Sequence, residues 1–318
     1  MNVDTVSRRA NAVLDEVERA IVGKREALEL VLLGMLADGH VLIEDFPGLA
    51  KTMIARAFAQ VTSIGFTRVQ FTPDLMPSDV TGASIYNQRE ADFEFRPGPI
   101  FTNLLLADEI NRAPPKTQAA LLEAMQERQV TIDGQTHELG DRFMVVATQN
   151  PIEQQGVYPL PEAQLDRFLF KQSVDYPTLE EERKIIATHG AKKGAMEPSA
   201  WGVECKADKK EIAAALEAVN GVRLVDEVID YIAALVRGTR ETADLESGAS
   251  PRAGAMLAGA ARARAAIDGR DFVIPDDVKA LAPALLRHRV ILSPAAEING
   301  RKVEEIVSTI IEAIEAPR

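Results

Sequence analysis

The chain has 318 residues, of which 46% are hydrophobic and 26% are charged, and its formal net charge is −12. This length predicts about two domains, no run of about 20 apolar residues indicates a membrane span, and the acidic balance argues against a general affinity for nucleic-acid backbone. The single Cys205 excludes an internal disulfide framework and a multi-cysteine zinc site. The first residues lack a secretory pattern, so we expect a cytoplasmic protein.

Two helices and a strand are predicted for the first part of the chain. Apolar residues recur at helical spacing over residues 6–37, and Ile21-Val22-Gly23-Lys24 interrupts them, because a glycine between two helical runs marks a break. A strand-like run at residues 40–44 then opens into a loop, residues 45–52, and a further helical segment.

Five apolar runs alternate with helical patterns, at residues 41–44, 66–71, 104–107, 143–148 and 168–174. Strands that alternate with helices imply parallel βαβ units, so we predict a three-layer α/β domain with a parallel five-stranded sheet. Residues 72–95 are too long for a plain connection and indicate an insertion. Asp133-Gly134, between two strand-like arms at about 129–140, predicts a projecting hairpin.

After residue 177 the strand signals stop, and alanine-rich helical patterns continue to the end of the chain. We therefore predict a nucleotide-binding core over residues 1–177 and an all-helical second domain over residues 178–318.

The loop before the third helical segment has features of a phosphate-binding loop. Such a loop needs inward backbone N–H groups, a helix N-terminus, a lysine for the outer phosphates and a hydroxyl for magnesium, and Lys51 and Thr52 can supply the last two. The usual spacing would place glycine where this chain has Asp45 and Ala50, and a carboxylate near polyphosphate is repulsive. On the loop alone, phosphate binding and an ordinary strand-to-helix turn both remain open.

Two adjacent acids follow the apolar run at residues 104–107 and favour the first interpretation. Functional groups of a parallel sheet gather at the carboxyl ends of its strands. There Asp108 can hold Mg²⁺ directly or through water, and Glu109 can orient and deprotonate an attacking water. The structural alternative is that Asp108 caps the helix that starts near Pro114 and Pro115.

Three more polar residues are candidates. Asn150 follows the strand-like run at 143–148 and could hydrogen-bond the water and the γ-phosphate, or else belong to an Asn-Pro turn. Arg167 could supply a cation to the reaction, or it could simply pair with Asp166 or Glu162 on the surface. Arg252 stands in the first turn of a helix, where a cation opposes the helix dipole, which favours a nearby anion.

Three segments carry a resemblance to a known family: Gly98-Pro99-Ile100-Phe101-Thr102-Asn103 leading into Leu104-Leu105-Leu106-Ala107-Asp108-Glu109-Ile110-Asn111-Arg112-Ala113-Pro114, then Ala147-Thr148-Gln149-Asn150-Pro151, then Leu160-Pro161-Glu162-Ala163-Gln164-Leu165-Asp166-Arg167-Phe168. Through them the chain resembles the MoxR family of AAA+ ATPases over nearly its whole length. The resemblance implies a P-loop AAA+ core, with the helix-two and pre-sensor insertions of this clade at about 72–95 and 129–140, and a helical lid.

The resemblance also implies roles for individual residues. Catalytic roles fall to Glu109 (Walker B), Asn150 (sensor 1), Arg167 (an arginine finger presented to a neighbouring subunit) and Arg252 (sensor 2). Mg²⁺ would be held by Thr52 and Asp108. The residues implied to bind ATP are Ile21, Val22 and Gly23 near the adenine, Pro47, Gly48, Leu49, Ala50, Lys51, Thr52 and Met53 of the Walker A loop, and Asp108. We expect the core and the lid to clamp ATP between them.

By the same resemblance, we expect a hexameric ring that acts as a chaperone-like factor in the maturation or assembly of other proteins, including metalloenzymes, beside a partner with a von Willebrand factor A domain. Two alternatives remain. One is a metal-chelatase motor subunit, whose insertions are similar. The other is a nucleic-acid-associated AAA+ motor, which ranks lower because its pore elements need basic and aromatic residues, and residues 130–139 contain only His137 of these types.

Overall fold

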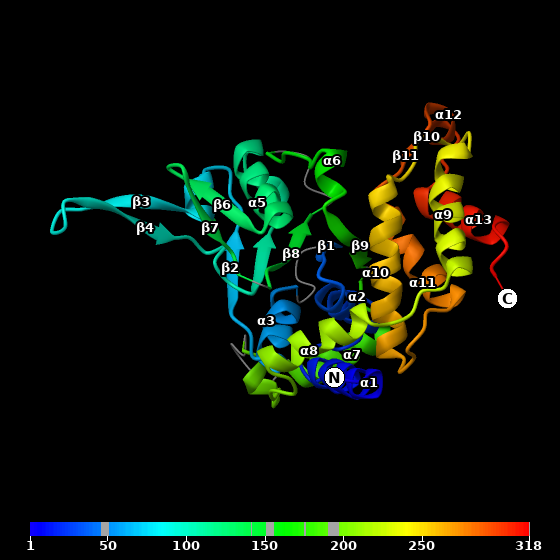
Figure 1. Cartoon of the computed structure of the whole chain (residues 1–318), viewed down its shortest axis with the longest axis horizontal. Coiled ribbons are helices and arrows are strands. Elements are labelled where there is room, and N and C mark those ends of the chain that lie inside the picture. Colours follow the sequence, from blue (N-terminus) through cyan, green and yellow to red (C-terminus); the bar gives the residue numbers. More distant parts are fainter. Residues whose placement is uncertain (46–50, 141, 151–155, 175, 190–196, 318) are drawn as a thin grey trace.

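A parallel five-stranded sheet lies at the centre of the chain (Figure 1). The computed structural model describes residues 1–45, 51–140, 142–150, 156–174, 176–189 and 197–317. Along the sheet the strand order is β2 (Phe66–Gln70), β5 (Leu104–Asp108), β8 (Met144–Gln149), β1 (His40–Asp45) and β9 (Phe168–Val174). Every pair of neighbours is parallel. The predicted sheet, with its five strands, is confirmed.

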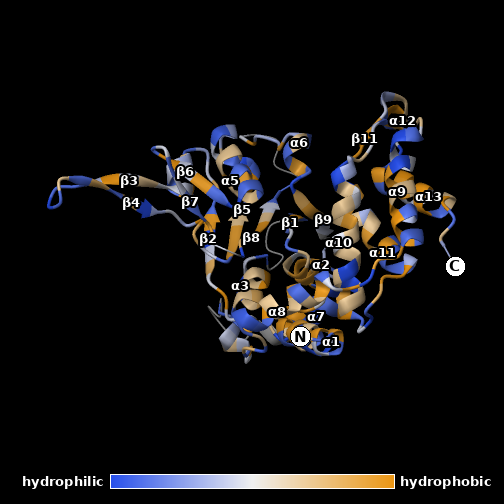
Figure 2. Ribbon diagram, in the orientation of Figure 1, coloured by the Kyte–Doolittle hydropathy of each residue, from blue (hydrophilic) through white to orange (hydrophobic). Residues whose placement is uncertain are grey.

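Helices cover both faces of this sheet, because successive side chains of each buried strand enter opposite cores. Val41 and Ile43 of β1 pack in a cluster with α1 (Val3–Val17), α2 (Arg25–Leu36) and α3 (Lys51–Val61), whereas Leu42 packs with α5 (Pro115–Glu127) on the other face. In Figure 2 the apolar residues gather on the central strands and on the helix faces turned toward them. The predicted three-layer α/β core is therefore present.

Both predicted insertions are present. After α4 (Pro77–Thr81), strands β3 (Gly82–Asn87) and β4 (Asp92–Pro97) form an antiparallel hairpin that projects far from the core (Figure 1). Strands β6 (Gln129–Ile132) and β7 (Gln135–Glu138) form the second hairpin, and both turn residues, Asp133 and Gly134, have positive φ, as a tight hairpin turn requires. Phe95 of the first hairpin stacks on His137 of the second, with ring centroids 3.8 Å apart.

The segment after the sheet is mainly helical. Its longer helices are α7 (Leu179–His189), α8 (Lys209–Asn220), α9 (Asp226–Glu241), α10 (Pro251–Ile267), α11 (Pro275–Leu286) and α13 (Val303–Ala313), and its short ones are α12 (Pro294–Ile298) and the 3-10 helix η2 (Pro198–Trp201). The core contains two further short helices, α6 (Glu162–Leu165) and the 3-10 helix η1 (Ile110–Arg112). The segment after the sheet is not wholly helical, because β10 (Leu245–Ser247) pairs with β11 (Ile291–Leu292). Strands of two and three residues are too short to leave an alternating pattern in the sequence.

The helical segment is fastened to the core at several points. The backbone N–H groups of Lys206 and Ala207 donate to the carbonyl of Val61, at 2.8 and 3.1 Å. The Ser7 hydroxyl donates to the carbonyl of Ile267 at the end of α10. Because α8 returns to the core helices, the domain boundary near residue 177 stays a prediction. None of the helices in the described ranges has the length and apolar character needed to cross a lipid bilayer.

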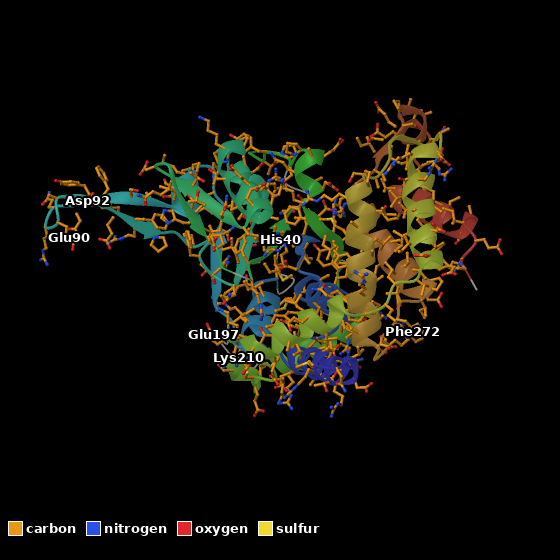
Figure 3. The ribbon with its side chains drawn as sticks, in the orientation of Figure 1. His40, Glu90, Asp92, Glu197, Lys210 and Phe272 are labelled. Atoms are coloured by element: carbon orange, nitrogen blue, oxygen red, sulfur yellow. The ribbon has the colours of Figure 1, made fainter. Side chains whose placement is uncertain are left out.

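His40 is buried beside the sheet (Figure 3), where its Nδ1 accepts the Val145 N–H at 3.0 Å and its Nε2 faces the Met125 carbonyl at 3.1 Å. Burial, followed by the charge of Arg128, lowers the pKa of His40 to about 3. Burial and the charge of Arg289 likewise hold the pKa of His288 well below its usual value. Both imidazoles are therefore neutral in the folded chain near pH 7.

This neutrality makes the fold sensitive to acid. Below about pH 6.5 the unfolded chain binds protons at these histidines that the folded chain does not, so the free energy of unfolding should decrease as the pH falls toward the folded pKa values. For His40 we expect a loss of roughly 2 kcal/mol between pH 7.5 and pH 5. Urea unfolding of the parent and of His40→Gln across this range measures the effect, and identical pH slopes in the two proteins would contradict it.

Candidate active site

The two predicted acids stand at the carboxyl end of β5, each held by a different partner. Asp108 is only 9% exposed, and the hydroxyl of Thr148, on the neighbouring strand β8, donates to its Oδ1 at 2.6 Å. The same hydroxyl oxygen accepts the backbone N–H of Glu109 at 2.9 Å. Thr148 thus fixes the Asp108 carboxylate and the start of the turn that follows.

Glu109 adopts a left-handed backbone conformation with φ of 55°. This conformation is rare for a residue with a side chain and costs roughly 1 kcal/mol or more, so it persists only where its surroundings impose it. Its carboxylate Oε2 accepts Nε2 of Gln70 at 2.7 Å and Nη1 of Arg112 at 3.0 Å. The general-base candidate is therefore held by two hydrogen-bond donors, Gln70 and Arg112.

Arg68 is a further member of the site. From β2 its Nη2 and Nε donate to Oδ2 of Asp108, at 2.7 and 3.1 Å, and Nη2 also donates to Oε1 of Gln70 at 2.6 Å. Sequence reasoning missed Arg68, Gln70, Arg112 and Thr148. The available signal was the alternation of Arg68 and Gln70 around Val69, which puts both polar side chains on one face of the strand.

The phosphate-loop candidates lie at the same edge of the sheet. Lys51, Thr52 and Met53 form the first turn of α3, directly after the connection from β1, and are half-buried. Pro47, Gly48, Leu49 and Ala50 fall outside the described residues, so their roles stay predictions. Because β8 lies between β1 and β5 and all three strands run parallel, the ends of β1, β5 and β8 meet along one edge.

Asn150 completes this edge at the end of β8. It is 6% exposed, and its backbone carbonyl accepts Nδ2 of Asn111 at 3.4 Å. Asn150 thus lies at the same edge of the sheet as Asp108, and its assignment as sensor 1 stays a prediction.

The predicted adenine segment is a tight bend between α1 and α2. Ile21 is buried, and Gly23 has φ of 72°. A Cβ on Gly23 would lie 2.2 Å from Oε1 of Glu181, and Oε2 of the same carboxylate accepts the N–H of Thr178 at 2.8 Å, just before α7. The positive φ favours glycine at this position, whereas the Glu181 carboxylate is the end of a flexible side chain that can shift. Val22, beside Gly23, is half-buried.

Arg167 and Arg252 lie at the opposite edge of the sheet. Arg167 precedes β9, whose first residue, Phe168, pairs with the first residue of β1, His40. Nη1 of Arg167 donates to the backbone carbonyl of Leu122 in α5. Since a six-residue strand such as β1 spans about 20 Å, Arg167 is far from the carboxyl edge of its own chain.

Arg252 belongs to the same region. Its charge is the smallest of the causes that lower the pKa values of His40 and Arg289. Arg289 is 8% exposed and binds Oδ1 of Asp166 at 2.8 Å and Sδ of Met256, one turn along α10 from Arg252, at 3.0 Å. Because this start of α10 lies beside the amino end of β9, the assignment of Arg252 as sensor 2 stays a prediction. A helix N-terminus is recognisable in sequence, but the edge of the sheet that it faces is not.

The residues at the carboxyl edge suit Mg²⁺. This ion prefers hard oxygen ligands and is usually held by one or two protein groups together with substrate phosphates. Asp108 offers a carboxylate oriented by Thr148, and a cation, the Arg68 guanidinium, already sits at Oδ2. Thr52 adds a hydroxyl in the first turn of α3.

A separate apolar cavity of about 430 Å³ lies between α9 and α10, lined by residues such as Ile232, Val236 and Ala258. The polar side chains of its lining are those of Arg237 and Arg240, with no carboxylate or hydroxyl among the lining residues. It lacks the groups that metal-assisted phosphate chemistry needs, so the carboxyl edge of the sheet remains the better candidate.

Known proteins share this sequence and architecture. The sequence profile described as "ATPase family associated with various cellular activities (AAA)" matches residues 40–170, and that of the AAA lid domain matches residues 237–310. The chain is 48% identical to the uncharacterized protein YeaC of Bacillus subtilis, over 96% of this chain and 93% of that protein. It is 45% identical to "Chaperone MoxR1" of Mycobacterium tuberculosis (95% and 81%) and 30% identical to "Protein MoxR" of Methylorubrum extorquens (95% and 93%).

A solved structure extends the similarity to the fold. The crystal structure of a candidate ATPase from Cytophaga hutchinsonii superposes with a TM-score of 0.90 and 38% sequence identity. The match covers 99% of this chain and 96% of that chain.

Proposed function

Because this chain belongs to the MoxR family of AAA+ ATPases and is an ATPase, we propose that it hydrolyses ATP with Mg²⁺ at the carboxyl edge of its sheet. The observation that carries this proposal is the separate positioning of two adjacent acids. Asp108 is oriented by Thr148 at the end of β5, whereas Glu109 is turned by its positive φ toward Gln70 and Arg112. One carboxylate is thus available for a metal and the other for water.

Each residue at this edge has a defined task in phosphoryl transfer to water. Lys51 offsets the charge of the outer phosphates, and Asn150 hydrogen-bonds the attacking water. Glu109 orients that water and accepts its proton as the water attacks. Thr52 and Asp108 would hold Mg²⁺, which when bound neutralises the phosphate oxygens. Ile21, Val22 and Gly23 bind the adenine. Before it can act, Glu109 has to exchange its contacts with Gln70 and Arg112 for the water.

A ring supplies the remaining groups. Arg167 directly precedes β9, and the start of α10, which carries Arg252, is linked through Met256 and Arg289 to the same end of β9, about a strand length from the carboxyl edge. In a head-to-tail ring each subunit presents a different surface to its neighbour on either side. We infer a hexamer in which Arg167 and Arg252 enter the nucleotide site of the adjacent subunit, with Arg167 stabilising the charge of the transition state.

The biological role proposed is that of a chaperone-like factor that remodels protein clients, including metalloenzymes, in the cytoplasm. The similarity to "Chaperone MoxR1" supports it. The partner proposed is a protein with a von Willebrand factor A domain. The exposed hairpin β3–β4 carries Glu90 and Asp92 at its far end (Figure 3), which does not favour contact with nucleic-acid backbone.

The test of the nucleotide site is Lys51→Ala. We expect this substitution to abolish ATP binding, because it removes the lysine of the loop that offsets the outer phosphates. Titration calorimetry with ATP and Mg²⁺ measures the affinity, and Lys116→Ala, an exposed lysine at the start of α5, is the matched control. Unchanged affinity in Lys51→Ala would mean that the loop is only a structural turn.

A further inference from the structure

The counter-ion of Asp108 is supplied by the chain itself. Two nitrogen atoms of Arg68 donate to Oδ2, at 2.7 and 3.1 Å, while Oδ1 is occupied by the hydroxyl of Thr148 at 2.6 Å. Both oxygens of this carboxylate are therefore engaged. A carboxylate that is 9% exposed would be costly to leave unpaired, so the guanidinium stabilises the site before any ligand arrives.

The same arginine is placed so that it can leave. Strand β2 is one of the two edge strands of the sheet, and the side chain of Arg68 is 41% exposed. Its guanidinium can rotate into solvent without opening the core, whereas Asp108 stays oriented by Thr148. An exchange of cations at Oδ2 thus requires the movement of one half-exposed side chain.

We propose, on the basis of the proposed function, that Arg68 is a resident counter-ion that competes with Mg²⁺ for Asp108. The two cations seek the same oxygen, so each weakens the binding of the other. Arg68 also donates to Oε1 of Gln70 at 2.6 Å, and Gln70 donates to Glu109 at 2.7 Å. When Arg68 leaves, Gln70 loses this hydrogen bond and therefore holds Glu109 less firmly. Arg68 is a positioning residue that sets the metal concentration at which the site assembles.

The test is the Mg²⁺ dependence of ADP binding by the full chain. Mg²⁺ is titrated into protein with ADP, and the half-saturating concentration is followed by calorimetry. Arg68→Gln keeps a hydrogen-bonding side chain without the charge, so we expect half-saturation at roughly five- to tenfold less Mg²⁺. Arg68→Lys should remain near the parent. Arg89→Ala, an exposed arginine of the β3–β4 hairpin, is the matched control and should not change the value.

Stability without metal gives a second readout. In EDTA and without nucleotide, Arg68→Gln should unfold at a lower temperature than the parent, because Asp108 loses its counter-ion. The loss should be smaller when Asp108→Asn is already present. An equal loss in both backgrounds would overturn the pairing on which the proposal rests.

The outcomes separate this proposal from the proposed function. If the parent binds ADP equally well in Mg²⁺ and in EDTA, the magnesium site itself is wrong, and the competition is overturned with it. If the parent requires Mg²⁺ but Arg68→Gln binds it equally well or more weakly, only the competition is overturned. Weaker ADP binding by Arg68→Gln in EDTA would instead assign Arg68 to the phosphates and would also overturn the proposal.

Discussion

Replacement of Arg167 by alanine is expected to leave ATP binding intact and to lower turnover by about a thousandfold. An arginine finger stabilises charge that develops in the transition state, so its loss affects hydrolysis far more than ground-state binding. The position of Arg167 supports its action on an adjacent subunit. Arg167 precedes β9, at the edge of the sheet opposite the phosphate-loop residues of its own chain. Steady-state ATPase rates and calorimetric ATP affinities measure the two quantities separately, and Arg237→Ala, an exposed arginine of α9, is the control.

Mixed rings then test whether the site is shared between subunits. Arg167→Ala subunits keep an intact phosphate loop, and Lys51→Ala subunits keep an intact finger. In randomly mixed rings about a quarter of the interfaces should pair the two intact groups and regain activity. Rescue of two inactive proteins cannot come from a surface ion pair within one chain. Full activity of Arg167→Ala alone, or no rescue where mixed rings demonstrably form, would reject the shared site. Arg252→Ala in the same assay tests its assignment to the neighbour.

Glu109→Gln is expected to retain ATP affinity while turnover falls on the order of a hundredfold or more. The amide cannot accept a proton from water, whereas the metal ligand Asp108 and its hydrogen bond from Thr148 are unchanged. Single-turnover hydrolysis, together with ATP affinity, separates a loss of chemistry from a loss of binding.

The matched control for Glu109→Gln is Glu123→Gln, which makes the same chemical change at an exposed position of α5. A twofold effect of Glu109→Gln would remove this residue from the role of general base. A large loss of ATP affinity would instead indicate that the contacts of Glu109 with Gln70 and Arg112 shape the pocket.

Sequence alone predicted the sheet because apolar runs alternate with helical patterns, and the clearest of these runs lies in β5, whose residues are all buried. It also predicted the two acids, since polar groups that end such a run must lie at the sheet edge. The partners of those acids were not predictable. Thr148 and Arg68 reach Asp108 only because β8 and β2 flank β5, and this strand order is set by tertiary packing. Taken by itself, an arginine on β2 is indistinguishable from a solvent-facing residue of an edge strand.

The lid also has a contact that the sequence does not predict, between residues far apart in the chain. Residues 250–252 predicted the start of α10 correctly, because a serine followed by proline marks a helix N-terminus. The position of this N-terminus of α10 relative to the sheet depends on Arg289. The guanidinium of Arg289 is buried against Asp166 and the carbonyls at the start of β9. Burial lowers the pKa of Arg289 to about 10, and Asp166 opposes this decrease. A contact across more than a hundred residues leaves no local pattern.

The anchoring of Arg289 has a consequence for how a ring would communicate. Arg289 binds Asp166, the residue before Arg167, and also contacts Met256, one turn from Arg252. The segments that carry the two arginines are thus linked through Arg289, although one belongs to the core and the other to the lid. In the proposed ring, once either arginine reaches the neighbour's phosphates, the other is held there at high effective concentration. The two arginines of a subunit would then bind the neighbour's nucleotide together or not at all. The contact between adjacent subunits would therefore have two states, without intermediate ones.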